Sequence, residues 1–317
     1  MGGLNANPAA SVRQRLLDLA RRRGDDFQLV LARYGAERFL YRLGRSEFKD
    51  RFVLKGAMLF VVWWEDTYRP TRDLDLLGLG RGDPDTLGGA IARICAVPCP
   101  EDGLVFDADN ISIAAIREED EYGGLRVKLV AYLGKTRIPL QIDVGFGDKV
   151  IPRPRLERYP TLLDLPAPRV KVYPRETMVA EKFEAMVRLG AANSRMKDFY
   201  DLAALAASYD FEGSLLREAV KGTFERRRSP AGSETPSALR SAFYSDPGRD
   251  GMWRAFLSGN ALRLEMPGRF EEVGELLIAF LKPVWESLVS DGELNATWTG
   301  GGPWRTKRDT DPGGTGE

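Results

Sequence analysis

The sequence predicts an α+β protein in which a small mixed sheet lies between helical regions. β-Rich runs at 111–116, 125–133 and 138–146 are separated by glycine or charged turns, without regular strand–helix alternation. Apolar side chains recur at helical spacing before residue 50 and after residue 174. We therefore expect four regions: basic N-terminal helices over 1–50, an α/β core over 51–170, a helical domain over 171–295 and a disordered, Gly- and Pro-rich tail over 296–317.

The composition is that of an ordinary globular chain, with 43% hydrophobic and 29% charged residues among 317. No apolar run approaches the roughly 20 residues of a membrane helix, and no signal peptide opens the chain, so we expect a cytoplasmic protein with no membrane partner. The absence of histidine excludes Ser-His-Asp and Cys-His mechanisms. Cys95 and Cys99 lack further zinc ligands and are expected to be buried or incidental thiols. Catalysis must use carboxylates, lysines, hydroxyls or bound metal.

The first fifty residues are predicted to form basic helices, because Val12, Leu16 and Leu19 recur at helical spacing and 27–41 continues the pattern. The basic residues here are Arg13, Arg15, Arg21, Arg22, Arg23, Arg33, Arg38, Arg42, Arg45, Lys49 and Arg51. They form either a solvated helical face or a phosphate-binding surface. Since the formal net charge is zero, a nucleic acid would require such a local patch.

An Asp-x-Asp pair lies on the strand expected at 73–77. Alternate side chains of a strand share a face, so Asp73 and Asp75 point the same way with Cα atoms roughly 7 Å apart, while Leu74 and Leu76 face the core. Two neighbouring carboxylates repel each other. A pair of Mg²⁺ ions relieves this repulsion and clamps the attacking and leaving oxygens of a phosphoryl displacement. The exposed face of an edge strand would show the same pattern.

Two further features favour a metal-dependent phosphoryl-transfer site. Asp143 lies on the polar face of the strand expected at 138–146, where a third carboxylate would complete a two-metal site; an exposed strand aspartate is the alternative. Lys55-Gly56 ends a strand and begins a helix. Glycine there lets backbone N–H groups approach phosphate oxygens, whereas the alternative is an ordinary tight turn.

A lysine and an aspartate occur on consecutive predicted helices. Lys182 borders the apolar stripe of the helix at 176–189, beside Met178 and Met186. Asp198 begins the next helix and either caps it or pairs with Lys182, which would then contact a triphosphate.

The segment Gly78-Leu79-Gly80-Arg81-Gly82 offers a competing interpretation. It follows a strand and precedes a helix, as dinucleotide-binding motifs do. Its spacing is Gly-x-Gly-x-Gly rather than Gly-x-Gly-x-x-Gly, and the chain lacks the alternation of a doubly wound sheet. A turn is therefore the favoured interpretation.

Four motifs occur in an order that resembles the AbiEii/AbiGii toxin family, which includes the MenT toxins of mycobacteria. The motifs are Lys55-Gly56, Thr71-Arg72-Asp73-Leu74-Asp75, Glu181-Lys182-Phe183 and Lys197-Asp198-Phe199-Tyr200-Asp201-Leu202. The family belongs to the DNA-polymerase-β-like nucleotidyltransferase superfamily, so the resemblance implies a polymerase-β-like core. It also implies that Asp73 and Asp75 hold metal, that Lys182 contacts nucleotide phosphates and that Asp198 is catalytic.

The same resemblance implies the biological setting. Family members are toxins paired with an antitoxin, and some add nucleotides to the 3′ end of tRNA and so block aminoacylation. This chain departs from the superfamily in having Gly56-Ala57 where Gly-Ser or Gly-Gly is usual. Lys55 and Thr71 are the residues that would compensate for the missing hydroxyl.

Together these features predict how an NTP and two Mg²⁺ ions would bind. Asp73, Asp75 and Asp143 are the expected metal ligands, and either Asp143 or Asp198 would deprotonate the tRNA hydroxyl. The expected nucleotide-binding residues are Lys55, Gly56, Thr71, Arg72 and Lys182.

Thr71 is also a predicted regulatory site. A phosphate there would add about two negative charges beside the carboxylates, so phosphorylation prompted by an antitoxin would silence the enzyme. Two alternatives to tRNA modification remain: transfer to a protein or small molecule, and a non-catalytic nucleotide- or antitoxin-binding module.

Overall fold

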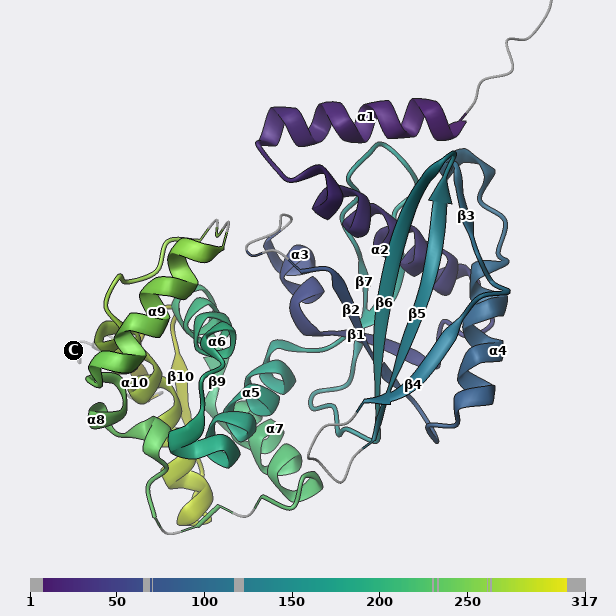
Figure 1. Ribbon diagram of the computed structural model, residues 1–317. Coiled ribbons are helices and arrows are strands. Elements are labelled where there is room, and N and C mark those ends of the chain that lie inside the picture. The colour runs from purple at the N-terminus through teal and green to yellow at the C-terminus, as the bar shows by residue number, and fades with distance from the viewer. Residues whose placement is uncertain are drawn as a thin grey trace, which may run out of the picture. The chain divides into compact units, whose positions relative to one another are not determined.

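The structure is a computed structural model that describes residues 8–64, 69, 71–116, 123–229, 231–232, 234–260, 262 and 264–306. The chain divides into two compact units, one comprising Met1–Asp148 and Pro154–Tyr173, the other Lys149–Arg153 and Pro174–Glu317. Each unit combines helices with a sheet, which confirms the expected α+β class (Figure 1). No helix in the described ranges has both the length and the apolar character needed to cross a membrane.

The first unit is built around an eight-stranded mixed sheet. In the described ranges its strand order is β3-β5-β6-β2-β1-β8-β7, with β4 also paired to β5. The β2–β6 and β1–β8 pairs are parallel, and the other pairs are antiparallel. The elements are α1 (Pro8–Arg23), α2 (Phe27–Arg45), β1 (Phe52–Lys55), η1 (Gly56–Met58), α3 (Leu59–Trp64), β2 (Asp73–Gly78), α4 (Pro84–Cys95), η2 (Pro100–Asp102), β3 (Leu104–Phe106), β4 (Ser112–Ile116), β5 (Gly124–Leu133), β6 (Thr136–Phe146), β7 (Arg155–Arg158) and β8 (Arg169–Val172).

The two faces of the sheet differ in chemistry. Buried side chains of β6, among them Ile138 and Leu140, lie against α2, where Gly35 allows close approach. Leu74 and Leu76 of β2 are buried and in register with the same apolar face of β6. Figure 1 shows α2 behind β5 and β6. Because strand side chains alternate, the polar residues of β2 and β6 occupy the face that α2 leaves open.

The prediction of a basic surface on the N-terminal helices is wrong for three of its arginines. Arg33, Arg38 and Arg42 are buried, so they belong neither to a solvated face nor to a phosphate-binding surface. The buried carboxylate of Asp102 explains two of them, because it accepts hydrogen bonds from Arg42 at 2.6 Å and from Arg38 at 3.1 Å. The arginines of α1 are exposed: Arg13, Arg15, Arg21, Arg22 and Arg23.

The second unit is mainly helical, with a core of aromatic side chains such as Phe199, Tyr244 and Phe270. The segment Lys149–Arg153 joins this unit because the Thr177 hydroxyl donates to the carbonyl of Ile151 and accepts from its N–H. The elements are α5 (Arg175–Leu189), η3 (Gly190–Ala192), α6 (Met196–Ser208), β9 (Phe211–Glu212), α7 (Gly213–Arg226), η4 (Ser237–Leu239), α8 (Ser241–Tyr244), α9 (Pro247–Gly259), α10 (Phe270–Val289), β10 (Ala296–Trp298) and β11 (Trp304–Thr306).

The start of the expected disordered tail is instead ordered structure. Residues 296–306 form β10 and β11, and β10 pairs with β9. Trp298 is fully buried, its indole N–H donates to the carbonyl of Ala206 at 2.7 Å, and its ring packs on Phe280. Burial of this tryptophan offsets the low hydrophobicity of its neighbours. Residues 307–317 lie outside the described part of the chain.

Candidate active site

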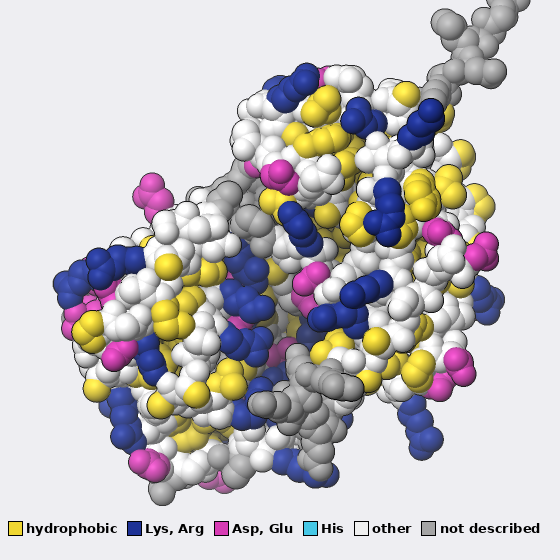
Figure 2. Space-filling model, in the orientation of Figure 1, with side chains coloured by type: hydrophobic (Ala, Val, Ile, Leu, Met, Phe, Trp, Pro, Cys, Tyr) yellow, Lys and Arg dark blue, Asp and Glu magenta, His cyan; other side chains and the backbone are white. Residues whose placement is uncertain are grey.

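A row of four charged residues crosses the open face of the sheet in the first unit. In register, Arg126 of β5 lies opposite Asp143 of β6, Asp143 beside Asp75 of β2, and Asp75 opposite Lys55 of β1. Residues paired in register project from the same face of a sheet. The row therefore reads cation, anion, anion, cation across four strands. Figure 2 shows basic and acidic side chains interspersed on this side of the first unit.

The Asp-x-Asp pair has the orientation predicted for it. Asp73 is exposed and Asp75 is half-buried, whereas Leu74 between them is buried. Asp73 lies beside Gln141 in the parallel β2–β6 pair, and Asp75 lies beside Asp143. β2 is an interior strand of the sheet, so the edge-strand alternative is wrong.

Gly56 makes room for one of these carboxylates. It has a φ of +70°, in the left-handed region, and a Cβ built on it would collide with the Asp75 carboxylate. The position therefore needs glycine for two reasons, its backbone conformation and the close approach of Asp75. A plain tight turn would need only the first.

Asp143 is held by an arginine that the sequence analysis did not single out. Arg126 donates to both carboxylate oxygens, from Nε at 2.8 Å and from a terminal nitrogen at 2.7 Å. This hydrogen bonding, followed by the charges of Asp143, Asp73 and Asp75, raises the pKa of Arg126. The guanidinium is therefore the local counter-charge of all three carboxylates.

The other end of the row is also paired. The ammonium of Lys55 lies 2.9 Å from Oδ2 of Asp148 and 5.2 Å from the ring centroid of Tyr173. Thr71 is half-buried and Arg72 exposed on the approach to β2, and the Thr71 hydroxyl donates weakly to the Asp73 carbonyl at 3.4 Å. Lys55, Gly56 and Thr71 are thus each tied to the strands that carry the acidic residues.

The carboxylates suit a hard divalent cation in chemistry, because Mg²⁺ prefers oxygen ligands. Asp75 and Asp143 are register neighbours, and Asp73 shares their face. Within the described ranges, however, no group of three or more acidic or thiol side chains is gathered closely enough to hold an ion. The set fits Mg²⁺ by residue type and face, provided that the carboxylates draw together.

The predicted lysine–carboxylate pair is present in the second unit. Lys182 of α5 lies 2.6 Å from Oδ1 of Asp198 and 2.8 Å from Oδ2 of Asp201, both on α6. Arg195 lies 2.9 Å from the other oxygen of Asp198. The N-cap position of α6 is Arg195 and shows no side-chain cap hydrogen bond, so the capping alternative for Asp198 is wrong.

The two aspartates beside Lys182 differ in acidity. Burial acts to raise the pKa of Asp198, but the charges of Lys182 and Arg195 outweigh it and hold the pKa below its usual value. Complete burial raises the pKa of Asp201 well above its usual value. Lys182 thus contacts one aspartate whose ionised form is favoured and another whose ionised form burial disfavours. The sequence motif around Asp198 contains Asp201, but no role was predicted for it. Asp201 follows Asp198 by three residues, which places both on the same helix face and could have indicated a shared partner.

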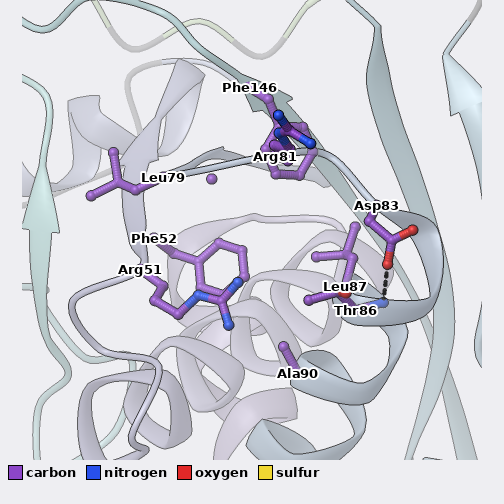
Figure 3. Close-up of a pocket in the computed structure, with 10 residues that line it drawn as sticks. Arg51, Phe52, Leu79, Arg81, Asp83, Thr86, Leu87, Ala90 and Phe146 are labelled. Atoms are coloured by element: carbon purple, nitrogen blue, oxygen red, sulfur yellow. Dashed lines mark hydrogen bonds between the residues drawn. The ribbon is translucent and has the colours of Figure 1, made fainter.

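The glycine-rich segment has a packing role. A side chain at Gly78 or at Gly82 would collide with the ring of Phe146, so both glycines accommodate that ring. The following helix, α4, is capped by its own Asp83, which accepts from the N–H of Thr86 at 2.7 Å (Figure 3). That carboxylate takes the position where a dinucleotide phosphate would bind. The turn interpretation agrees with this geometry.

Comparisons with known proteins identify a family for this chain. A family profile described as "Nucleotidyl transferase AbiEii toxin, Type IV TA system" matches residues 38–275. The solved structure of JHP933 from Helicobacter pylori is 16% identical, with a TM-score of 0.45, over 79% of this chain and 89% of that one. A second H. pylori structure, described as a candidate nucleotidyltransferase, is 16% identical, with a TM-score of 0.43, over 79% and 92%. No curated protein sequence matches this chain.

Proposed function

The chain belongs to the AbiEii nucleotidyl transferase toxin family, and we propose that it transfers a nucleoside monophosphate from an NTP to the 3′ end of tRNA in the cytoplasm, which blocks translation. The family match makes the chain a nucleotidyltransferase of a type IV toxin–antitoxin system. The observation that carries the proposal is the in-register row of carboxylates on the open sheet face, with Asp73 beside it.

In the proposed site, Asp73, Asp75 and Asp143 would hold two Mg²⁺ ions. When bound, Mg²⁺ supplies positive charge that stabilises the phosphoryl transition state. Lys55 and Arg72 add charge to the triphosphate, and Lys182 is proposed as a phosphate contact on the strength of its sequence motif alone. Gly56 offers backbone N–H groups to phosphate oxygens, and Thr71 offers a hydroxyl. Gly56-Ala57 lacks the hydroxyl that a Gly-Ser turn would supply, so the Thr71 hydroxyl, on the approach to β2, is the proposed replacement.

The proposed reaction is an in-line displacement. The 3′-hydroxyl oxygen of the tRNA attacks the α-phosphorus, the bond to the bridging oxygen of the β-phosphate breaks, and pyrophosphate leaves. A carboxylate accepts the hydroxyl proton, either Asp143 or Asp198. The pKa of Asp198, held below its usual value, keeps this carboxylate ionised beside the Lys182 ammonium, 2.6 Å away.

The acceptor is proposed to be held by α1. The five exposed arginines of this helix are available to a phosphate backbone, as are the exposed Arg45, Lys49 and Arg51 further along the N-terminal region. Figure 2 shows Lys and Arg side chains at the surface of α1, at the top of the view. Binding through them would weaken as salt concentration rises.

The test is incubation of the purified protein with tRNA, Mg²⁺ and each labelled NTP in turn. We expect one NTP to label the tRNA 3′ end, and Asp73→Asn to abolish labelling. Asp164→Asn, an exposed aspartate of the same unit, is the matched control and should label normally. If a protein or small molecule in a lysate is labelled and tRNA is not, the acceptor is that molecule rather than tRNA. Growth inhibition that survives Asp73→Asn would indicate a binding module instead.

Phosphorylation of Thr71 is proposed as the means by which the antitoxin silences the toxin. The residue lies two positions before Asp73 and is partly exposed. A phosphate there would repel the incoming triphosphate. We expect an added phosphate mass after co-expression with the antitoxin and loss of labelling in Thr71→Glu, whereas Thr71→Ser, which keeps the hydroxyl, should still label tRNA when no antitoxin is present. An inactive but unmodified toxin would show that the antitoxin simply occludes the site.

A further inference from the structure

We propose that Arg126 is a built-in competitor for the divalent cation: it holds Asp143 when metal is absent, releases it when metal binds, and then turns to the nucleotide triphosphate. The inference rests on the proposed function for the presence of metal. It adds a positioning residue that decides when the third carboxylate becomes a ligand.

The hydrogen bonds of Asp143 carry the first step. Arg126 occupies both of its oxygens, at 2.8 and 2.7 Å, in a fork-to-fork pair. An oxygen that accepts such a charged hydrogen bond cannot at the same time present that lone pair to a cation. Gln141 adds a longer contact to the same carboxylate, at 3.5 Å. A cation chelated by both oxygens of Asp143 would use the same pair of lone pairs as the guanidinium fork, so chelation displaces Arg126.

The register of the sheet carries the second step. Asp143 lies directly beside Asp75, and Asp73 shares their face. Three carboxylates without a cation would repel one another strongly. Arg126, on the adjacent strand β5, is a cation that relieves this repulsion in the structure, with Lys55 at the other end of the row, and a divalent ion would relieve it more completely.

Exposure carries the third step. The side chain of Arg126 is 39% exposed, against 18% for Asp143. A guanidinium with this much access to solvent can leave its partner without becoming a buried, unpaired charge. Its planar fork matches phosphate oxygens as well as carboxylate oxygens, so a triphosphate on the open face offers it a new partner.

The test measures metal binding without catalysis. Mn²⁺ is titrated into the nucleotide-free protein, and free Mn²⁺ is followed by electron paramagnetic resonance. We expect Arg126→Gln to bind Mn²⁺ about tenfold more tightly than the unaltered protein, because Asp143 is released. Arg126→Lys should fall between them, since an ammonium cannot engage both oxygens at once.

Lys128→Gln is the matched control. Lys128 lies two residues along β5 on the same face, opposite Gln141, and is exposed. Its loss removes the same unit of charge without touching Asp143, so we expect Mn²⁺ affinity within about twofold of the unaltered protein. Asp75→Asn should abolish binding and so identify the site.

The outcomes separate the two ideas. If Arg126→Gln and Lys128→Gln bind Mn²⁺ alike, the competitor role is overturned while the metal site stands. If neither the unaltered protein nor any variant binds Mn²⁺, the metal-dependent part of the proposed function is refuted as well. With Mn²⁺ present, Arg126→Gln should bind the four NTPs about tenfold more weakly, and unchanged nucleotide affinity would refute the transfer of Arg126 to the triphosphate.

Discussion

The backbone at Gly56 is left-handed, and the Asp75 carboxylate occupies the space that a Cβ atom at this position would need. We expect Gly56→Ala to displace Asp75 and to reduce nucleotidyl transfer at least tenfold, since a misplaced ligand disturbs the reacting geometry. Gly24→Ala is the control, because Gly24 has a φ of +69° and open space around its Cβ position. Both variants place an alanine in a left-handed backbone, so each should lose about 1 kcal/mol of unfolding free energy, which thermal unfolding measures. Equal transfer by the two variants would refute the close-approach argument.

The two aspartates that contact Lys182 permit a second comparison at this scale. The pKa of Asp201 is raised and that of Asp198 lowered, so an amide should imitate Asp201 better than Asp198. We expect Asp198→Asn to lower transfer about 100-fold and Asp201→Asn only a few-fold, by analogy with the usual effect of removing a charge partner. Transfer assays on both variants check this. Equal losses would mean that Asp201 is ionised too.

Among the elements, α2 carries a carboxylate whose ionisation opposes folding. Burial raises the pKa of Glu37 to about 7, from an ordinary value of 4.5, although the N–H of Leu162 donates to it. Between these values the folded chain holds a proton that the unfolded chain has lost, so stability falls as pH rises through the window. We expect the unfolding free energy to drop by about 2 kcal/mol from pH 5.5 to 8 on this account.

The measurement for Glu37 is urea unfolding at several pH values, compared with Glu37→Gln. The glutamine variant should lack this part of the pH dependence, whatever other groups contribute to both proteins. Parallel curves for the two proteins would show that Glu37 does not titrate in this range.

Long elements with clear periodicity were predictable from the sequence, and short or non-local ones were not. The β2 and β6 strands and the faces of Asp73, Asp75 and Asp143 follow from alternation alone. β8 has four residues, too few to show a period, yet it pairs with β1. The burial of Arg38 was hidden because its partner, Asp102, is 64 residues away in the sequence.

The Arg126–Asp143 pair is an instructive omission. Strands β5 and β6 are joined by a two-residue turn, Gly134-Lys135, so Leu133 pairs with Thr136. Counting outward from this tight turn places Arg126 opposite Asp143, so the sequence contained the information once the hairpin was recognised. The bidentate geometry of the pair required the structure.

For the molecule as a whole, residues 296–306 are a structural part of the second unit. We expect Trp298→Ala to lower the unfolding free energy of that unit by about 3–5 kcal/mol, since it empties a fully buried site. Trp298→Phe keeps an aromatic ring near Phe280 but loses the indole hydrogen bond and part of the ring volume, which should cost less, about 1–3 kcal/mol. Chemical unfolding checks both values. A small effect of Trp298→Ala would show that β10 is dispensable.

The segment Lys149–Arg153 belongs to the second unit although residues of the first unit flank it on both sides, and this limits where the gene can be cut into two fragments. The chain leaves the first unit after Asp148 and returns at Pro154, before its final departure at Pro174. A split-protein reporter cut between codons 173 and 174 would strand five residues in the wrong fragment, away from the Thr177 hydroxyl that clasps Ile151. Fragments that reassemble cleanly would instead need breakpoints on both sides of that segment.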